Sequence, residues 1–452
     1  GMQSMNTMMK FEEKNDEERG GKGKEGVPEK RPATVFVDNS PLETHKLYFT
    51  KIDGLPDQFN EYAYNLYELL GHINPVSSVH FNYMIDTRWL ISQYPSRSRN
   101  TPMTIIVGDK QGTTVKEIKG EAEKEGWTNI NVSTASLPIP FGTHHSKLSL
   151  FEDDDMTLHI IISTANLLQY DWKMNTQLFY YMKSTRKIQF EKFPRRAEKG
   201  IPIVMDLIEY LGRYPIEGLT YWKDRLGEAE FEYTVNRIVS SVPGYHKGDD
   251  INKVGHKLVR NILKKERASD QNSIKTLVCQ SSSIGSLGTH PYKWLKGEFI
   301  VSMRGEKDVS NTQCCIIYPT KDDVEKSVNG KSSGCSLPYA KKTAERQEWL
   351  LGNMCKWRCE NWGRSRIMPH VKTYIQIDSN TRQFDWQIVT SANLSKAAWG
   401  ELQKGGQQLV IRSYEIGVLV MDPRGIRAPF DYPLYQYKEE DRPWYIDDLN
   451  GD

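Results

Sequence analysis

The sequence predicts an α/β protein made of two similar halves. Short apolar strand patterns alternate with helical patterns from about residue 45 onward, which is typical of sheets covered by helices. The alternation starts again near residue 232. One His-x-Lys motif occurs in each half, at His145–Lys147 and His370–Lys372, and each is followed about twenty residues later by an Asn-Leu pair. We therefore expect one domain over 44–232, a second over 233–452, and one site built from both.

The composition is that of a globular enzyme. Hydrophobic residues make up 38% of the 452 residues, enough for a large core. No apolar run of about eighteen residues predicts a membrane span, and we expect no signal peptide. The six cysteines form no zinc-like quartet, which favours structural thiols in a reducing compartment, cytosol or nucleus. Because the net charge is only +2, any nucleic-acid binding must come from a local patch.

Residues 1–43 predict a disordered tail, since they are rich in Lys, Glu and Gly and lack any apolar periodicity. A few basic side chains there could form part of a nuclear-import signal, although the glutamates between them favour a solvated tail. These side chains are Lys22, Lys24, Lys30 and Arg31.

The first half is expected to alternate strands and helices in the following order. Periodicity predicts strands over 45–50, 77–85, 103–107, 130–132, 145–151 and 157–163, and helices over 60–70, 87–94, 115–125, 201–213 and 217–226. The acidic run 153–155 joins the last two strands, and we read it as a solvated turn rather than a metal site.

The second half repeats the alternation of strands and helices, starting with a strand pattern over 231–240. The expected elements are a helix over 251–267, a strand over 275–279, a Ser-rich loop over 281–288, a helix over 289–301, a strand over 314–318, a helix over 340–360, and strands over 370–377, 384–390 and 415–420. The segment from Pro423 onward is expected to be irregular but packed, because it contains Trp444.

The two His-x-Lys motifs suit phosphodiester chemistry. On a strand, residues i and i+2 face the same way, so His145 lies with Lys147 and His144 points to the opposite face. A single motif is more often a half-buried histidine beside a lysine, but two copies with matched asparagines favour a shared site. One imidazole can attack phosphorus while the other protonates the leaving oxygen, and the lysines and asparagines can hold the phosphate oxygens. This chemistry needs no divalent metal and no cofactor.

The duplicated motif resembles the phospholipase D superfamily, whose motif usually carries an Asp four further residues on. Here Glu152 and Ile377 stand at those places, and later asparagines appear instead. This pattern, in which the Asp is replaced and an asparagine follows later, resembles that of the tyrosyl-DNA phosphodiesterase branch of the superfamily. The resemblance extends from about residue 45 over nearly the whole chain, through segments such as Phe141-Gly-Thr-His-His145, Ser282-Ser-Ile-Gly-Ser-Leu-Gly288, Gly334-Cys-Ser-Leu-Pro-Tyr339, Met368-Pro-His-Val-Lys-Thr-Tyr374, Arg412-Ser-Tyr-Glu-Ile-Gly417 and Asp441-Arg-Pro-Trp444.

The resemblance implies a role for each matching residue. His145 would be the nucleophile and His370 the general acid and then the base. Lys147, Lys372, Asn166 and Asn393 would bind the phosphate, while Gln177 and Glu415 would orient the two histidines, in an assignment that the sequence leaves open. The implied contacts with DNA or its attached peptide are Tyr83, Phe141, Ser282, Ser283, Ser336, Ser395 and Trp444. The implied fold is phospholipase D-like, with a mixed sheet flanked by helices in each of two pseudo-twofold-related domains and the site at their interface.

The implied activity is metal-independent hydrolysis of the 3′-phosphotyrosyl bond between DNA and a stalled type IB topoisomerase. It would leave a DNA 3′-phosphate, and other 3′ adducts could also be processed. The enzyme would be a nuclear DNA-repair protein and a monomer without membrane association. Two alternatives remain at this point. One is a phospholipase or general nuclease of the same superfamily, and the other is a DNA-end or peptide-binding scaffold without catalytic activity.

Overall fold

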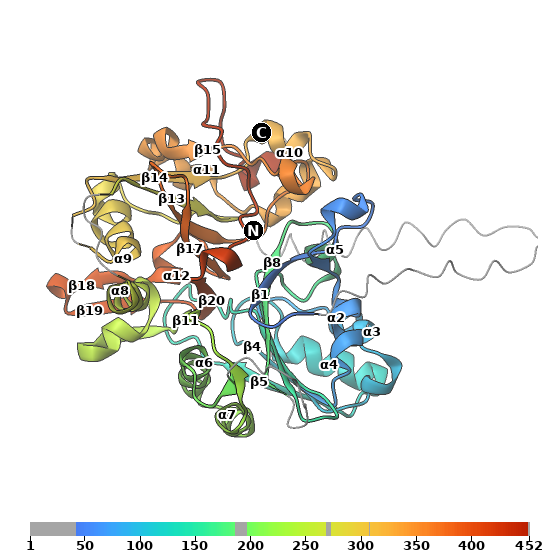
Figure 1. The fold of residues 1–452 in the computed structure, drawn as a ribbon. Helices are drawn as coiled ribbons and strands as arrows, with labels where there is room; N and C mark the ends of the chain where they lie inside the picture. The colour runs from blue at the N-terminus through green and yellow to red at the C-terminus, as the bar shows by residue number, and fades with distance from the viewer. Residues whose placement is uncertain (1–41, 186–196, 268–272, 307, 451–452) are drawn as a thin grey trace, which may run out of the picture. The chain divides into compact units, whose positions relative to one another are not determined.

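The structure, a computed structural model, describes residues 42–185, 197–267, 273–306 and 308–450. The tail expected over 1–43 lies almost entirely outside these residues. Glu43–Asp452 forms one compact unit. Two large mixed sheets organise it, with helices packed around them (Figure 1).

The first sheet has the strand order β2-β1-β8-β7-β6-β3-β4-β5. Its strands are β1 (Lys46–Thr50), β2 (Ala63–Tyr64), β3 (Ser77–Phe81), β4 (Met103–Gly108), β5 (Ile130–Ala135), β6 (Leu148–Glu152), β7 (Leu158–Ser163) and β8 (Leu178–Lys183). The helices of this half are α2 (Leu66–Ile73), α3 (Thr87–Gln93), α4 (Val115–Glu125), α5 (Gln169–Lys173), α6 (Pro202–Gly212) and α7 (Leu219–Glu228).

The second sheet has the order β11-β20-β17-β16-β13-β14-β15. Its strands are β11 (Arg237–Ser241), β13 (Lys275–Gln280), β14 (Thr312–Ile317), β15 (Met354–Cys355), β16 (Thr373–Asp378), β17 (Phe384–Thr390) and β20 (Glu415–Val420). A small sheet joins β12 (Gly244–Lys247), β19 (Gln408–Ile411) and β18 (Glu401–Gln403), and β9 (Ala197–Glu198) pairs with β10 (Phe231–Glu232). The helices are α8 (Gly255–Glu266), α9 (Ile300–Arg304), α10 (Lys321–Glu325), α11 (Lys341–Glu345) and α12 (Lys396–Trp399).

The two large sheets repeat one topology. In the first, β3 pairs parallel with β4 and antiparallel with β6, and in the second β13 pairs parallel with β14 and antiparallel with β16. The antiparallel series β6-β7-β8-β1 likewise matches β16-β17-β20-β11. The expected pair of mixed sheets flanked by helices is therefore confirmed, while the exact boundary near residue 232 remains a prediction.

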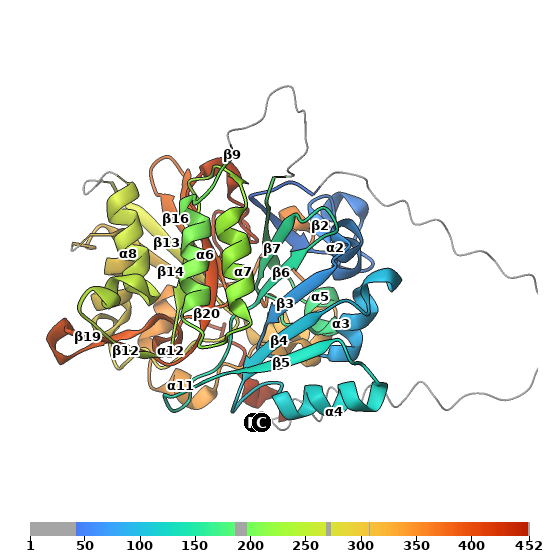
Figure 2. The same cartoon turned by 90° about the horizontal axis from the view of Figure 1, so that it is seen from below.

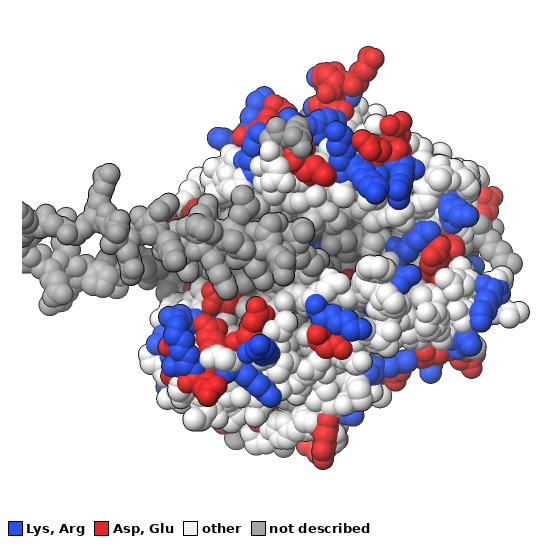
Figure 3. Space-filling model, turned by 180° about the vertical axis from the view of Figure 1, so that it is seen from behind, with Lys and Arg blue, Asp and Glu red and all other residues white. Residues whose placement is uncertain are grey.

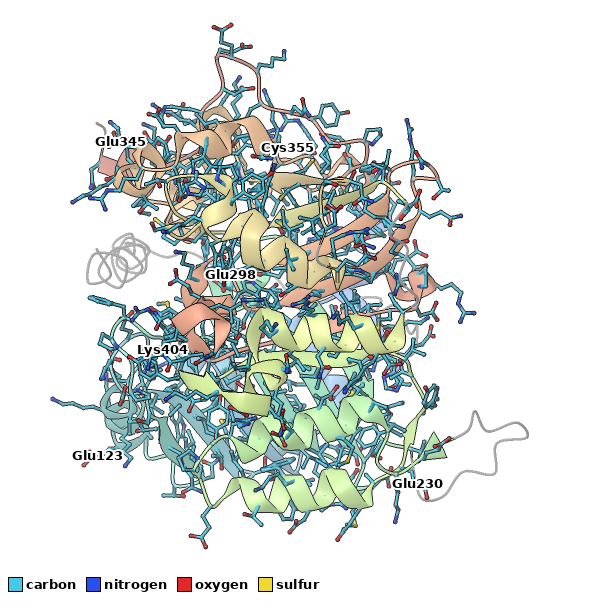
Figure 4. All side chains as sticks on the ribbon, turned by 90° about the vertical axis from the view of Figure 1, so that its left-hand side faces the viewer. Glu123, Glu230, Glu298, Glu345, Cys355 and Lys404 are labelled. Carbon is cyan, nitrogen blue, oxygen red and sulfur yellow. The ribbon has the colours of Figure 1, made fainter. Side chains whose placement is uncertain are left out.

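The sheets meet along β7 and β8 of the first and β17 and β20 of the second. One hydrophobic core includes side chains of both halves, such as Leu207 of α6 and Val418 of β20. Figure 2 shows α6 and α7 beside the sheets, and α6 and α8 both contact β11. Figure 4 shows the helical side, where Glu298 lies near α8 with its Oε2 atom 3.6 Å from Nε2 of the buried His256.

Most predicted elements are confirmed, and the helix over 115–125 matches α4 at both ends. The helix predicted over 60–70 instead begins at Leu66, because the side chains of Asn65 and Glu68 form a capping box there. The helix predicted over 289–301 starts as a 3-10 turn and a π-helix before α9.

The helix predicted over 340–360 is wrong. After α11 the chain forms a 3-10 helix over Glu348–Asn353, and then β15 pairs with β14. The buried side chain of Gln347 accepts a hydrogen bond from Leu287 N and donates one to Gly285 O, which ties this segment to the Ser-rich loop. Tertiary contacts therefore override a sequence of good helix formers.

Charge is mixed over the face shown in Figure 3, where lysines and arginines alternate with aspartates and glutamates. This distribution agrees with the small net charge of +2. No helix in the described part of the chain is both long enough and apolar enough to cross a membrane. The five buried cysteines, Cys279, Cys314, Cys315, Cys355 and Cys359, have free thiols.

Candidate active site

The two His-x-Lys motifs lie at the junction of the two sheets, each immediately before a central strand. His145–Lys147 precedes β6 and His370–Lys372 precedes β16, so the strands predicted to start at 145 and 370 begin three residues later. The backbone of each motif is bound by the opposite half. His145 N donates to Tyr414 O at 3.0 Å, and His370 N donates to Thr176 O at 3.1 Å.

Each histidine side chain is also oriented by a residue of the opposite half. Nδ1 of His145 lies 3.0 Å from Oε2 of Glu415, the first residue of β20. Nδ1 of His370 lies 2.9 Å from the side-chain amide of Gln177, which immediately precedes β8. The structure thereby answers the question that the sequence leaves open, since Glu415 contacts His145 and Gln177 contacts His370.

The hydrogen bond of Nδ1 defines which nitrogen of His145 is available for chemistry. An ionised carboxylate only accepts, so Nδ1 of His145 donates to Glu415 and leaves the Nε2 lone pair free. Near Nδ1 of His370, the Thr164 carbonyl oxygen at 3.1 Å and Oε1 of Gln177 at 3.2 Å can only accept, whereas the Gln177 amide nitrogen at 2.9 Å can only donate, so this nitrogen has partners of both kinds. Nζ of Lys372 lies 3.1 Å from Nε2 and 3.3 Å from Nδ1 of His370, so the amino group stands beside both ring nitrogens. The side chains of His145 and His370 are 14% and 10% exposed, so both can be reached from outside.

Small hydroxyl residues hold the two orienting side chains, and the sequence analysis did not single them out. The Thr164 hydroxyl donates to Oε1 of Gln177 at 2.8 Å, and the Ser391 hydroxyl donates to Glu415. A signal for them existed in the sequence. Each lies two residues before the asparagine of its half, in the matched runs that end at Asn166 and Asn393.

Lys147 and Lys372 occupy equivalent positions. Each Nζ donates to the backbone carbonyl of its own histidine, at 2.8 Å from His145 O and 2.6 Å from His370 O. Burial lowers the pKa of Lys147 to about 8, and burial together with Lys147 holds the pKa of Lys372 well below its usual value. Two lysines in one site favour the binding of an anion, because an anion would stabilise their charged forms against burial and mutual repulsion.

The same electrostatics act on the histidines and their partner carboxylate. Burial lowers the pKa of His145, and burial together with Lys372 and Lys147 holds the pKa of His370 well below 6.5. Burial alone would raise the pKa of Glu415, but His145 and Lys147 keep it below its ordinary value, so this carboxylate is charged. The site thus combines an ionised carboxylate with two lysines and two histidines whose pKa values are all lowered.

The two asparagines lie in different environments. Oδ1 of Asn393 accepts hydrogen bonds from Ser282 N and Ser283 N, each at 3.1 Å, so its amide nitrogen remains available as a donor. The backbone N–H of Asn166 donates to Oδ2 of Asp171 at 2.7 Å. That oxygen lies 3.6 Å from Nδ1 of His370, and Asp171 is a further site residue that the sequence analysis missed.

Aromatic candidates flank His145. The ring of Tyr83 lies 5.3 Å from the imidazole of His145, and Nζ of Lys147 lies 5.9 Å from its centroid. Phe141 is 85% exposed and has a φ of 63°, in a loop held by the opposite half. Arg412 Nη1 donates to the neighbouring Pro140 O at 2.8 Å, which helps to keep the phenyl ring of Phe141 in solvent.

The three remaining candidates for substrate contact, Ser336, Ser395 and Trp444, lie in different surroundings. The Ser336 hydroxyl accepts from Nδ2 of Asn175, two residues before Gln177, so it lies near the site. Ser395 caps α12 by accepting from Ala398 N at 3.2 Å. Trp444 is fully buried and donates to Gly334 O at 3.2 Å, so it packs in the core and offers no surface to a substrate. Its expected direct contact with the substrate is corrected accordingly.

Residues outside the site explain two other sequence features. His144 is fully buried with its ring between Asn82 O and the Tyr214 hydroxyl, as expected for the histidine on the opposite face. Glu152, at the place of the superfamily Asp, pairs with Arg225 at 2.7 Å instead of a site residue.

The acidic turn is a structural element. Oδ1 of Asp153 accepts two backbone N–H bonds, from Asp155 and Thr157, and Oδ2 pairs with His159 at 3.0 Å. Within the described ranges, no cluster of three or more His, Cys, Asp or Glu side chains could hold a metal ion.

Two symmetry-related histidine–lysine pairs, each oriented by the other half of a duplicated α/β fold, define a phosphodiesterase of the phospholipase D-like fold. Comparison with known proteins identifies the family within this class. The family model described as tyrosyl-DNA phosphodiesterase matches residues 46–438. The chain therefore belongs to the tyrosyl-DNA phosphodiesterase family, whose members are phosphodiester hydrolases.

Individual relatives agree with this assignment. A probable tyrosyl-DNA phosphodiesterase of Caenorhabditis elegans is 39% identical over 444 residues, which cover 95% of this chain and 95% of the relative. Tyrosyl-DNA phosphodiesterase 1 of Drosophila melanogaster is 31% identical over 96% of this chain and 77% of its own length. A crystal structure of the yeast tyrosyl-DNA phosphodiesterase has a TM-score of 0.66 at 21% identity, over 89% of this chain and 100% of that chain, and shows the shared fold.

Proposed function

We propose that this tyrosyl-DNA phosphodiesterase hydrolyses the 3′-phosphotyrosyl bond between DNA and a type IB topoisomerase peptide. The reaction runs through a covalent phosphohistidine, needs no metal, and leaves a DNA 3′-phosphate. The observation that carries the proposal is the crossed orientation of the histidines. Glu415 binds Nδ1 of His145 and leaves its Nε2 lone pair free, while His370 presents its own Nε2 beside Lys372.

In the first step, Nε2 of His145 attacks phosphorus and the bond from phosphorus to the tyrosine oxygen breaks. His370 reacts in its doubly protonated form, and the proton on its Nε2 passes to the departing phenolate. Phenolate is a good leaving group, with a pKa of about 10 against about 16 for water. The ammonium groups of Lys147 and Lys372, with the amide nitrogen of Asn393, stabilise the negative charge on the phosphoryl oxygens.

In the second step, His370 acts as the base, because it has lost its Nε2 proton in the first step. It removes a proton from water, the water oxygen bonds to phosphorus, and the bond from phosphorus to His145 Nε2 breaks. The Glu415 carboxylate stabilises the positive charge that His145 carries in the intermediate. The DNA end retains the phosphate, and both histidines return to their starting states.

The DNA strand is proposed to approach past Phe141 and the Ser282–Ser283 segment. The exposed phenyl ring of Phe141 can stack on an unpaired base. The Ser283 side chain, beside the phosphate-binding Asn393, can donate to the next phosphate group of the strand, while the Ser282 hydroxyl donates to Oδ1 of Asn393 and holds that amide in place.

The test uses two histidine variants and a 3′-phosphotyrosyl oligonucleotide in excess EDTA. His145→Ala should neither turn over nor form an adduct. His370→Asn should slow the second step more than the first, so a covalent protein–DNA species should accumulate and survive SDS. An adduct on His145→Ala, no adduct on His370→Asn, or loss of wild-type activity in EDTA would contradict the corresponding part of the proposal.

We further propose that the protein acts in the nucleus as a monomer. A DNA-repair substrate supports the location, and a site complete within one chain supports the oligomeric state. Cell fractionation and light scattering of the full chain test these two points, with a non-nuclear pool alone or a stable dimer as the contrary results.

A further inference from the structure

The histidine, lysine, hydroxyl and asparagine positions of the two half-sites correspond, and two other positions differ in charge. Thr164 corresponds to Ser391 and Asn166 to Asn393, and the bridges Ile85–Leu167 and Ile284–Leu394 confirm this register. The orienting residues differ in charge, because Gln177 stands where the other half has Glu415. Asp171 is the second of these positions. It is the fifth residue after Asn166, and the fifth residue after Asn393 is Ala398.

Asp171 therefore brings a carboxylate to the His370 side from a position that is alanine on the His145 side. It lies on α5, is 3% exposed, and uses Oδ2 to accept the backbone N–H of Asn166. The same oxygen lies 3.6 Å from Nδ1 of His370. Each histidine thus has one carboxylate, in direct contact at His145 and at longer range at His370.

His370 needs a negative neighbour more than His145 does. As the general acid it must carry a second proton before the bond breaks, yet three groups that can carry positive charge act on its ring. These are Lys372, with Nζ 3.1 Å from Nε2, and beyond it Lys147 and His145. Its other neighbours, Gln177 and Thr164 O, are neutral. Glu415 is in contact with His145, so Asp171 is the carboxylate directly beside the His370 ring among the described residues.

We propose that Asp171 is a positioning residue that allows His370 to carry the proton delivered to the leaving oxygen. Burial raises the pKa of the Asp171 carboxyl, while the Asn166 N–H, Lys372 and Lys147 favour its ionised form, whose charge offsets those two lysines. Gln177 and the Thr164 carbonyl set the ring orientation. Because the 3.6 Å separation is longer than the 3.0 Å bond between Glu415 and His145, Asp171 stabilises the imidazolium without holding the proton in a short ion pair. This inference rests on the proposed role of His370 as the acid.

The test compares two leaving groups in Asp171→Asn. The amide keeps an oxygen for the Asn166 N–H and removes only the charge. The variant should cleave a 3′-phosphotyrosyl oligonucleotide about tenfold more slowly in single turnover, a part of the 10²–10⁴ that a general acid supplies. A 3′-(p-nitrophenyl) phosphodiester, whose leaving group departs without a proton, should be cleaved within about twofold of the wild-type rate. The ratio of the two rates within one preparation does not depend on the fraction of protein that is folded.

The pH profile gives a second readout. Cleavage of the tyrosyl substrate requires protonated His370, so its rate falls as pH rises through the pKa of that histidine. Removing the negative charge of Asp171 lowers this pKa, so in Asp171→Asn the fall should begin at lower pH. A structural role alone would leave the position of this limb unchanged.

Asp153→Asn is the matched control, because Asp153 is also buried and accepts backbone N–H bonds but pairs with His159 away from the site. It should change neither the ratio of rates nor the pH profile. Equal slowing of both substrates in Asp171→Asn, with an unmoved pH limb, would overturn the inference. Failure of the wild-type protein to cleave the tyrosyl substrate would instead overturn the proposed function.

Discussion

Glu415→Gln tests how much of the reactivity of His145 depends on the carboxylate. Gln is nearly isosteric, and the side chain is only 5% exposed, so the replacement is confined by its surroundings. The Ser391 hydroxyl can still donate to the amide oxygen. The change therefore removes one negative charge 3.0 Å from Nδ1 of His145 and leaves the packing in place.

The expected size follows from the hydrogen bond that is weakened. A hydrogen bond to a charged group contributes about 1.5–3 kcal/mol, against about 0.5–1.5 kcal/mol for a neutral one. The difference of about 1–2 kcal/mol is felt in the transition state, where His145 becomes positively charged. Each 1.36 kcal/mol corresponds to a tenfold change in rate, so the chemical step should slow by about 5- to 30-fold.

Single-turnover cleavage of a 3′-phosphotyrosyl oligonucleotide measures this step directly. Glu152→Gln serves as the control, because it removes a buried carboxylate that pairs with Arg225 outside the site. It should lower stability without altering the rate of the folded enzyme. A Glu415→Gln rate within twofold of wild type, or equal slowing in the control, would refute the reasoning.

Three further predictions concern packing, DNA contact and pH. Gly334→Ala should lower the free energy of unfolding by about 1–3 kcal/mol in urea titrations, because its Cβ would lie 2.2 Å from Cζ2 of the buried Trp444. Gly352→Ala is the control and should leave the free energy of unfolding unchanged by any clash, because the space at its Cβ is open. Phe141→Ala should weaken binding of a single-stranded oligonucleotide by about 1–3 kcal/mol in anisotropy titrations and leave the unfolding midpoint unchanged, and unchanged affinity would argue against stacking. Burial lowers the pKa of His80 to about 3, so its contribution to stability is complete above pH 6.5 and falls by about 1.4 kcal/mol per pH unit below it. Between pH 7 and pH 5, His80→Gln should therefore lose about 2 kcal/mol less stability than wild type, and equal slopes would contradict this.

The elements that sequence predicted well are those with strong local signals. Helix α4 matches at both ends because Thr114 and Glu117 form a capping box and Gly126 ends the helix in the left-handed conformation. The segment after α11 lacked such signals. There the contacts of Gln347 and the pairing of β15 with β14 decide the conformation, and neither is visible in the local sequence.

The site residues were likewise predicted where the signal was local and missed or left unassigned where it was not. Local spacing identified His145 and His370 with their lysines, because each pair lies within three residues. The partners of the rings could not be assigned, since Glu415 is 270 positions from His145 and the choice depends on how the halves pack. Asp171 was missed because it belongs to no repeated motif, and its closeness to the His370 ring depends on how the two halves pack.

The crossed orientation of the histidines also bears on why two copies are joined in one chain. Two identical subunits could form the same reciprocal contacts, but exact symmetry would give both imidazoles the same neighbours and the same proton affinity. A reaction that needs a donor and an acceptor of protons at once would then depend on chance differences in protonation. Fusion into one chain lets one copy carry Glu415 and the other Gln177, so the two chemical tasks can be tuned separately. It also means that any rotation of one half against the other would disturb both histidines together.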